Sequence, residues 1–150
     1  MRLVLQRVAR AAVEVAGERV AAIGRGMLVL VGVEAGDGEA EAAAAAEKIA
    51  TLRVFEDERG RMNLDLGAAG GSVLVVAEFT LVADLRRGRR PSFAGTAPPT
   101  QAETLVESVV ARLRQRGCAV ETGRFGANMR VELVNEGPVT LVFELPPRGG

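Results

Sequence analysis

Two apolar runs of strand length constrain the fold more than any other feature of this chain. Residues 27–33 follow a glycine turn at 24–26 and carry no charge. Residues 72–81 are equally apolar until Glu78 and Thr80 break the pattern near the end of the run. Apolar runs of this length between turn residues are typical of buried β-strands, and they are far too short to span a membrane as helices. We therefore expect a fold built around a buried sheet.

Shorter segments with strand character fill much of the remaining chain. They are residues 3–5, 13–15, 19–23, 53–56, 119–122, 129–135 and 139–145. The tetrapeptide 135–138, which separates the last two, consists of residues that favour turns. The chain is therefore predicted to be rich in strands, with about eight of them.

Two helices are predicted besides the strands. The first begins near Asp37, has acidic residues in its first turn, and runs through alanines to about residue 52. The second begins at Thr100, where Glu103 would complete a capping box, and it ends at Gly117. The 150 residues are the length of one domain. We predict a single strand-rich α/β domain over residues 1–150, with two main helices and a flexible tail at 146–150.

Charge balance and missing residue types exclude several classes of function. Nineteen basic residues cancel nineteen acidic ones, so binding to nucleic acid would require a local basic patch. There is no His, Trp or Tyr, and Cys118 is the only cysteine. These absences exclude a Ser-His-Asp triad, a histidine-ligated metal site and an intrachain disulfide. We interpret Cys118 as a small core residue, and we expect a reduced, cytoplasmic setting without a signal peptide or membrane span.

A cluster of arginines is the first candidate for binding. Residues 85–99, here called the arginine loop, contain Arg86, Arg87, Arg89 and Arg90 and are predicted to be long and exposed. Because guanidinium groups match phosphate oxygens, the cluster is a candidate phosphate-binding site whose contacts would weaken with salt. The alternative interpretation is a solvated surface loop.

Two segments at strand ends are weak candidates for chemistry when each is taken alone. In residues 77–81, Thr80 is a candidate nucleophile, although no base beside it is obvious and its β propensity explains it equally well. In residues 123–129, Phe125 lies between two glycines. Such a loop allows a ligand to approach the backbone N–H groups, but it is also an ordinary connection with a buried aromatic ring.

The Gly137-Pro138 pair is a further candidate. A Gly-Pro bond in a tight turn is a candidate for the cis isomer, since proline lowers the preference for trans to about 0.5–1 kcal/mol. Gly137 has no side chain and Pro138 has no N–H, so the pair would present carbonyl oxygens and a rigid wall to a ligand. The alternative is a plain hairpin turn.

Together these segments resemble the D-aminoacyl-tRNA deacylases, also described as the D-tyrosyl-tRNA deacylase family. The matching motifs follow the family's order over nearly the whole chain, at residues 3–8, 46–55, 62–64, 79–81, 88–93, 97–99, 121–127 and 135–140. The resemblance implies a β-barrel-like fold that forms a homodimer. It also implies hydrolysis of the ester between a D-amino acid and tRNA, and in some cases of glycine mischarged on tRNA, without a metal or organic cofactor.

The resemblance assigns roles to individual residues. Phe79 and Thr80 match a strand-end motif whose backbone N–H groups face the scissile carbonyl. Gly137 and Pro138 match a Gly-cisPro motif that enters the partner subunit's pocket and excludes L-amino acids, and Arg7 matches an arginine that braces this motif. The residues assigned to the substrate pocket are Arg7, Glu78, Phe125, Gly126 and Met129.

The missing histidine is compatible with this chemistry. A ribose ester of an amino acid carries a neighbouring hydroxyl and is already activated, so positioning and backbone donors can supply much of the acceleration. Covalent attack by Thr80 is the rival mechanism. Ala77 and Glu78 replace the family's usual Ser-Gln, which leaves two other functions open: a dimeric tRNA-binding module with weakened catalysis, and an enzyme of the same fold that edits another mischarged tRNA.

Overall fold

The computed structural model describes residues 1–146, so the predicted flexible tail lies outside the described residues except for Pro146, which is exposed. The strands within this range are β1 (Arg2–Val15), β2 (Glu18–Ile23), β3 (Gly26–Gly32), β4 (Phe55–Glu56), β5 (Met62–Leu64), β6 (Ser72–Ala77), β7 (Ala119–Thr122) and β8 (Arg130–Glu144). The helices are α1 (Glu39–Thr51), α2 (Pro99–Gln115) and a short 3₁₀ helix, η1 (Phe79–Val82). None of these helices is both long and apolar enough to cross a membrane.

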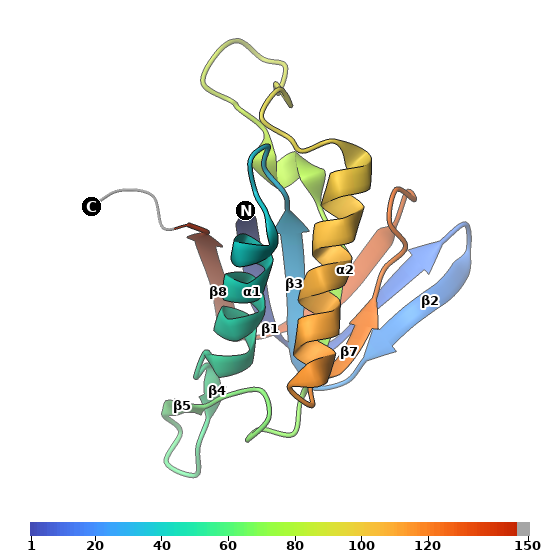
Figure 1. The fold of residues 1–150 in the computed structure, drawn as a ribbon. Coiled ribbons are helices and arrows are strands. Elements are labelled where there is room, and N and C mark those ends of the chain that lie inside the picture. Colours follow the sequence, from blue (N-terminus) through green and yellow to red (C-terminus); the bar gives the residue numbers. More distant parts are fainter. Residues whose placement is uncertain (147–150) are drawn as a thin grey trace.

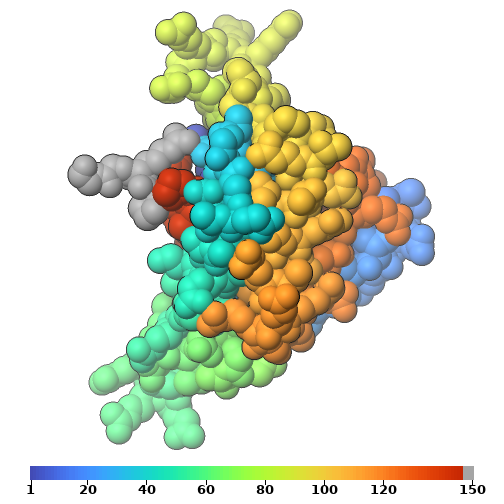
Figure 2. Space-filling view, in the orientation of Figure 1, coloured from blue at the N-terminus to red at the C-terminus, as the bar shows by residue number. Residues whose placement is uncertain are grey.

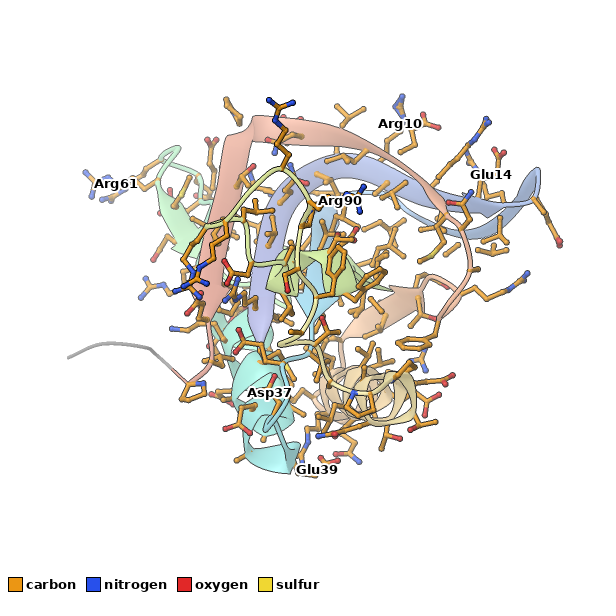
Figure 3. The ribbon with its side chains drawn as sticks, turned by 90° about the horizontal axis from the view of Figure 1, so that it is seen from above. Arg10, Glu14, Asp37, Glu39, Arg61 and Arg90 are labelled. Atoms are coloured by element: carbon orange, nitrogen blue, oxygen red, sulfur yellow. The ribbon has the colours of Figure 1, made fainter. Side chains whose placement is uncertain are left out.

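The long strand β1 organises the main sheet. The first half of β1 pairs with β3, its last residues pair with β2, and β8 pairs with it from end to end. Beyond β3 the order continues through β6 to β7, and these three strands are parallel to one another. Because β2 also approaches β6 and β7, the sheet curls into a nearly closed barrel. Figure 3 shows this curvature from above, and the prediction of a strand-rich α/β barrel is confirmed.

Two core layers hold the fold together. The helices α1 and α2 lie side by side over one face of the sheet (Figures 1 and 2), and the apolar stripe of α2, including Leu105, Val109 and Leu113, is buried there. A second cluster, which includes Val8, Leu28 and Leu74, fills the inside of the curled sheet. The sheet is therefore covered on both faces, as its uninterrupted apolar strands require.

Several predicted boundaries are wrong, and each has a local reason. Residues 3–5 and 13–15 belong to one strand, β1, because β8 pairs across the whole segment between them. The capping box predicted at Thr100 is absent, since α2 begins with Pro99 at its first position, where a proline is well tolerated. The strand predicted over 72–81 ends at Ala77, where its pairing with β3 ends, and the chain then turns into η1.

Candidate active site

A cavity of about 740 Å³ opens where the parallel strands β3 and β6 end. Its walls are the ends of these strands, the first turns of α2, the loop around residues 125–129, and Phe93 of the arginine loop. Ligands of parallel α/β sheets bind outside the carboxyl ends of the strands, which is the position of this cavity. It is therefore the candidate active site.

The cavity brings together most of the predicted pocket. Its lining includes Glu78, Phe79, Phe125, Gly126 and Met129, which come from two separate stretches of the chain, whereas Arg7 does not line it. Gly126 has a φ of +76°, a backbone conformation that favours glycine and lets the loop turn at the cavity wall. The fold thus brings together residues that the sequence analysis identified only by their match to family motifs.

Glu78 and Thr80 lie at the edge of the cavity. The Glu78 N–H donates to the Val31 carbonyl oxygen at 2.8 Å, which extends the contact of β6 with β3 by one residue. The Thr80 hydroxyl donates to Oε1 of Glu78. A carboxylate therefore lies beside Thr80, and it was not identified as a neighbour from the sequence. Thr80 itself is exposed and does not line the cavity. Its position therefore favours a supporting role over direct attack on a bound ester.

The arginine loop adjoins the cavity mouth. Phe93 of the loop contacts Phe79 of η1 edge to face, with the ring centroids 5.1 Å apart. The backbones of Asp84 and Ser92 pair with each other at 2.8 and 3.0 Å, which closes the base of the loop. Figure 2 shows the loop, in yellow-green, standing clear of the body of the molecule, and Figure 3 shows Arg90 on it, above the end of the sheet. The loop is exposed, as predicted.

The four arginines of the loop are not equivalent. Arg86 donates two hydrogen bonds to the Asp84 carboxylate, from Nε at 2.9 Å and from Nη2 at 2.8 Å. These bonds hold the pKa of Asp84 well below its usual range. Within residues 1–146 no ion pair engages Arg87, Arg89 or Arg90. The positive charge of the loop that no acidic side chain offsets therefore comes from these three.

The position of η1 depends on a close approach to Gly32, a residue that sequence reasoning missed. A Cβ at Gly32 would lie 3.0 Å from the Glu78 carbonyl oxygen, 3.0 Å from the Leu81 Cβ and 3.1 Å from Cγ2 of Val82. These distances are shorter than ordinary van der Waals contact. Only glycine at the end of β3 lets η1 pack this closely against the strand.

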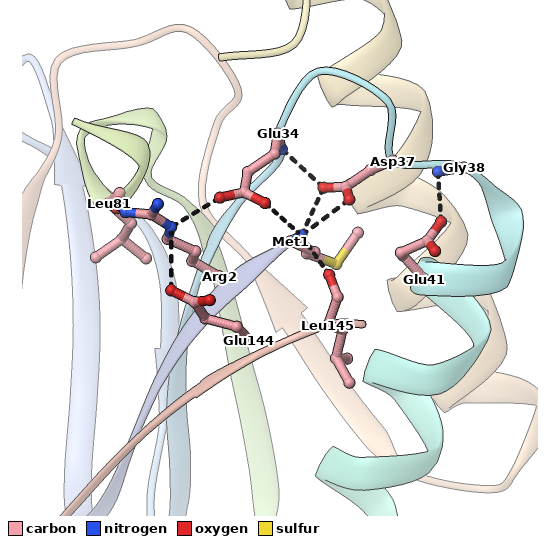
Figure 4. Close-up of polar contacts among 9 residues, drawn as sticks. All are labelled: Met1, Arg2, Glu34, Asp37, Gly38, Glu41, Leu81, Glu144 and Leu145. Carbon is pink, nitrogen blue, oxygen red and sulfur yellow. Dashed lines mark hydrogen bonds and ion pairs between the residues drawn. The ribbon is translucent and has the colours of Figure 1, made fainter. Parts of the chain in front are cut away.

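Arg2 is a second missed residue, and it ties η1 to the amino terminus (Figure 4). Its Nη1 donates to the Leu81 carbonyl oxygen at 3.2 Å, and its Nε donates to Glu34 at 2.8 Å. The buried Met1 ammonium reaches the same Glu34 at 3.4 Å and Asp37 at 2.8 Å. The charges of this cluster are thus paired, as buried charges must be.

Gly137 and Pro138 do not form the predicted hairpin turn. Strand β8 continues through them, but its register against β1 shifts, so that residues 136–139 stand opposite Arg7 alone. The Asn135 side chain closes this bulge, because its Oδ1 accepts from the Val139 N–H at 2.8 Å and its Nδ2 donates to the Val139 carbonyl at 3.1 Å. The peptide bond between Gly137 and Pro138 is cis, as predicted.

Arg7 holds the bulge in place. It is buried, and it donates from Nε to the Glu136 carbonyl at 2.8 Å and from Nη1 to the Val54 carbonyl at 2.7 Å. Gly137 has a φ of +143°, and a Cβ there would lie 3.0 Å from Nη2 of Arg7. The bulge borders a different depression, which it shares with Arg7 and Arg25. In one chain, the bulge and the cavity are therefore separate surfaces.

Other reactive groups contribute little to the site. Cys118 is half-buried, and burial raises the pKa of its thiol, which makes it less nucleophilic. Among the described residues there is no group of three or more side chains suited to hold a metal ion. Over the same range, one buried side-chain polar atom lacks a hydrogen-bond partner, Oγ1 of Thr96, and Thr96 lines the cavity.

Comparison with known proteins identifies the scaffold. A family described as D-Tyr-tRNA(Tyr) deacylase matches residues 4–144. A D-aminoacyl-tRNA deacylase of Heliobacterium modesticaldum is 57% identical over 150 residues, covering 100% of this chain and 99% of the relative. One from a Roseiflexus species is 57% identical over 144 residues, covering 96% of this chain and 93% of the relative.

Two solved structures share the fold. One, described as a c-Myc DNA unwinding element binding protein, superposes with a TM-score of 0.92 at 40% identity and covers 97% of this chain and 99% of its own. The other, a probable eukaryotic D-amino acid tRNA deacylase, has a TM-score of 0.80 at 17% identity, with 95% and 97% covered. Because the family match and relatives more than half identical extend over nearly all of this sequence, the chain belongs to the D-Tyr-tRNA(Tyr) deacylase family.

Proposed function

We propose that this protein hydrolyses the ester bond between a D-amino acid and tRNA, and so removes D-amino acids from translation. The observation that carries the proposal is the cavity at the ends of β3 and β6, which gathers Phe79, Phe125 and Met129 in a chain of this family. A cavity of this size holds an amino acid with the terminal nucleoside of tRNA.

In the proposed reaction, the ester carbonyl lies against the start of η1. The N–H groups of Phe79 and Thr80 open this helix, and the first N–H groups of a helix have no acceptor within it. They donate to the oxygen that becomes negative when water, positioned by the neighbouring ribose hydroxyl, attacks the carbonyl carbon and gives up a proton. The ester C–O bond then breaks and the ribose oxygen takes a proton. Each such donor typically contributes about 10²–10³ in rate, and positioning supplies much of the remainder.

A second copy of the chain completes the site in this proposal. The bulge with Gly137 and Pro138 is exposed and lies outside the cavity of its own chain, so the bulge of one protomer enters the cavity of the other across a two-fold axis. There its carbonyl oxygens accept hydrogen bonds from the substrate ammonium. With the ammonium and the ester both fixed, the side chain of an L-amino acid points into the bulge, whereas that of a D-amino acid points outward.

The same geometry predicts that glycine passes the filter. Glycine has no side chain for the bulge to exclude, so tRNA mischarged with glycine is a second proposed substrate. Comparing hydrolysis of glycyl-tRNA with that of a D-aminoacyl-tRNA tests this point. If the D-ester is cleaved and glycyl-tRNA is not, the bulge does not select substrates by their side chains alone.

The arginine loop is the proposed contact with the tRNA backbone. The loop reaches the cavity through Phe93, and its Arg87, Arg89 and Arg90 form no ion pairs with acidic side chains in the described part of the chain. Replacing all three with Gln should weaken tRNA binding and reduce the salt slope of the binding constant by up to about three counterions. Arg86→Gln is the matched control, because this residue is already paired with Asp84. An unchanged slope in the triple variant would make the loop a solvated surface loop.

The experiment that tests the function is the release of amino acid from D-phenylalanyl-tRNA, with L-phenylalanyl-tRNA as the control. We expect rapid hydrolysis of the D-ester alone, from a particle with twice the 15.7 kDa of one chain by light scattering. Binding of tRNA without hydrolysis of either ester would support a non-catalytic module. Cleavage of the L-ester would support an editing enzyme for another substrate.

A further inference from the structure

The cavity contains a single charged side chain. Glu78 lines it together with valines, alanines, prolines and the rings of Phe79, Phe93 and Phe125, and every other residue of the lining is uncharged. Within the described part of the chain, no cation forms an ion pair with Glu78. A carboxylate beside apolar walls interacts more strongly with a cation than it would in water, because the local dielectric is lower.

The Glu78 carboxylate is held in place from two sides. Its backbone is fixed by the bond from its N–H to Val31 and by the Leu81 N–H, which donates to its carbonyl oxygen at 3.2 Å. The Thr80 hydroxyl donates to Oε1, which restricts the side-chain orientation. Since a carboxylate accepts about four hydrogen bonds, capacity remains on both oxygens for a ligand.

We propose that Glu78 binds the α-ammonium group of the substrate and makes this cavity selective for amino acid esters with a free amine. The inference rests on the proposed function, which supplies the ammonium. An ammonium group has three N–H donors. In the proposed dimer, carbonyl oxygens of the bulge around Gly137 accept from it, and Glu78 takes a remaining donor from the other side. Esters whose amine is acylated or missing lose this contact.

The test is a comparison of two esters on the same tRNA. D-phenylalanyl-tRNA carries the ammonium, and 3-phenylpropionyl-tRNA has the same skeleton with hydrogen in its place. For the wild-type protein, kcat/KM should be much higher on the ester with the amine. Glu78→Gln keeps the shape and an oxygen that can accept from Thr80 but removes the charge, so it should lower this preference about tenfold, with the loss falling mainly on the D-phenylalanyl ester.

Two further variants complete the experiment. Glu58→Gln removes the same charge from the exposed turn between β4 and β5, at the opposite end of the molecule from the arginine loop, and should leave the preference as in the wild type. Glu78→Asp keeps the charge on a shorter side chain and should retain part of the preference. If the wild type cleaves neither ester, the proposed function is wrong. If it cleaves the D-phenylalanyl ester but Glu78→Gln keeps the full preference, the inference about Glu78 alone is overturned.

Discussion

Replacing Arg7 with methionine should both destabilise the fold and loosen chirality selection. Methionine is also unbranched but is shorter and has no charge and no donors, so the carbonyls of Glu136 and Val54 lose their hydrogen bonds. A bond from a charged donor contributes about 1.5–3 kcal/mol, and Arg7 is only 6% exposed, so solvent screens it little. Glu136 is exposed, and its carbonyl can bind water instead of Arg7. We therefore expect each of the two bonds to contribute near the lower end of this range, so that the variant loses about 3 kcal/mol of unfolding free energy in total.

The assay is urea unfolding, followed by hydrolysis of D- and L-phenylalanyl-tRNA under conditions where the variant is folded. Because Arg7 holds the bulge, we expect the D-over-L preference of Arg7→Met to fall about tenfold or more, the equivalent of one such hydrogen bond. Arg10→Met is the matched control, since Arg10 lies on the same strand, is exposed, and reaches Glu132 only at 3.8 Å. It should change the unfolding free energy by less than about 0.5 kcal/mol. An Arg7→Met protein with wild-type stability and selectivity would refute the reasoning.

The other predictions concern the residues around η1 and the arginine loop. Gly32→Ala should push η1 away from β3, cost about 1–3 kcal/mol of unfolding free energy and lower kcat, whereas Gly24→Ala, with open space around its Cβ position, should do neither. Thr80→Val should keep activity within about tenfold, the worth of one hydrogen bond, and a folded but inactive protein would instead support covalent attack by its hydroxyl. Arg86→Gln should raise the pKa of Asp84 toward its usual 3.8 in an NMR titration. Because the pKa of Asp84 is lowered in the folded state, the ion pair stabilises the fold at neutral pH, and this stabilisation is lost as the pH falls through that pKa. The unfolding free energy of Arg86→Gln should not show this pH dependence.

Much of the fold is predictable from the sequence because local patterns decide it. The strand predicted at residues 119–122 coincides with β7, and both helices begin within two residues of their predicted starts, since apolar periodicity and turn residues act over short distances. The predicted turn at 135–138 fails for the opposite reason. Asn135 to Pro138 have turn propensity, but pairing with β1 on both sides holds the segment in β8 as a bulge.

The candidate site is only partly readable from the sequence. Phe79 and Phe125 are visible as motif residues, yet only the fold shows that they share one cavity. The roles of Gly32 and Arg2 depend on how closely η1 approaches β3 and the amino terminus, which no local pattern encodes. Glu78 and Thr80 are two residues apart, and side chains at this spacing share a face of a strand, so their proximity is compatible with the predicted strand as well as with the start of η1.

The central claim is that the cavity of one chain and the bulge of another form one active site, and mixed dimers test it most directly. Gly137→Ala damages the bulge, and Ala127→Trp fills the cavity, so each variant alone should be inactive. When equal amounts of the two variants are unfolded together and refolded, half of the dimers should contain one chain of each. In such a dimer the intact cavity of the Gly137→Ala chain receives the intact bulge of the Ala127→Trp chain, so one of its two sites is complete. The mixture should therefore recover about a quarter of the wild-type hydrolysis of D-phenylalanyl-tRNA. If the mixture of the two folded, inactive variants stays as inactive as its components, the bulge does not act across the dimer and the account is contradicted.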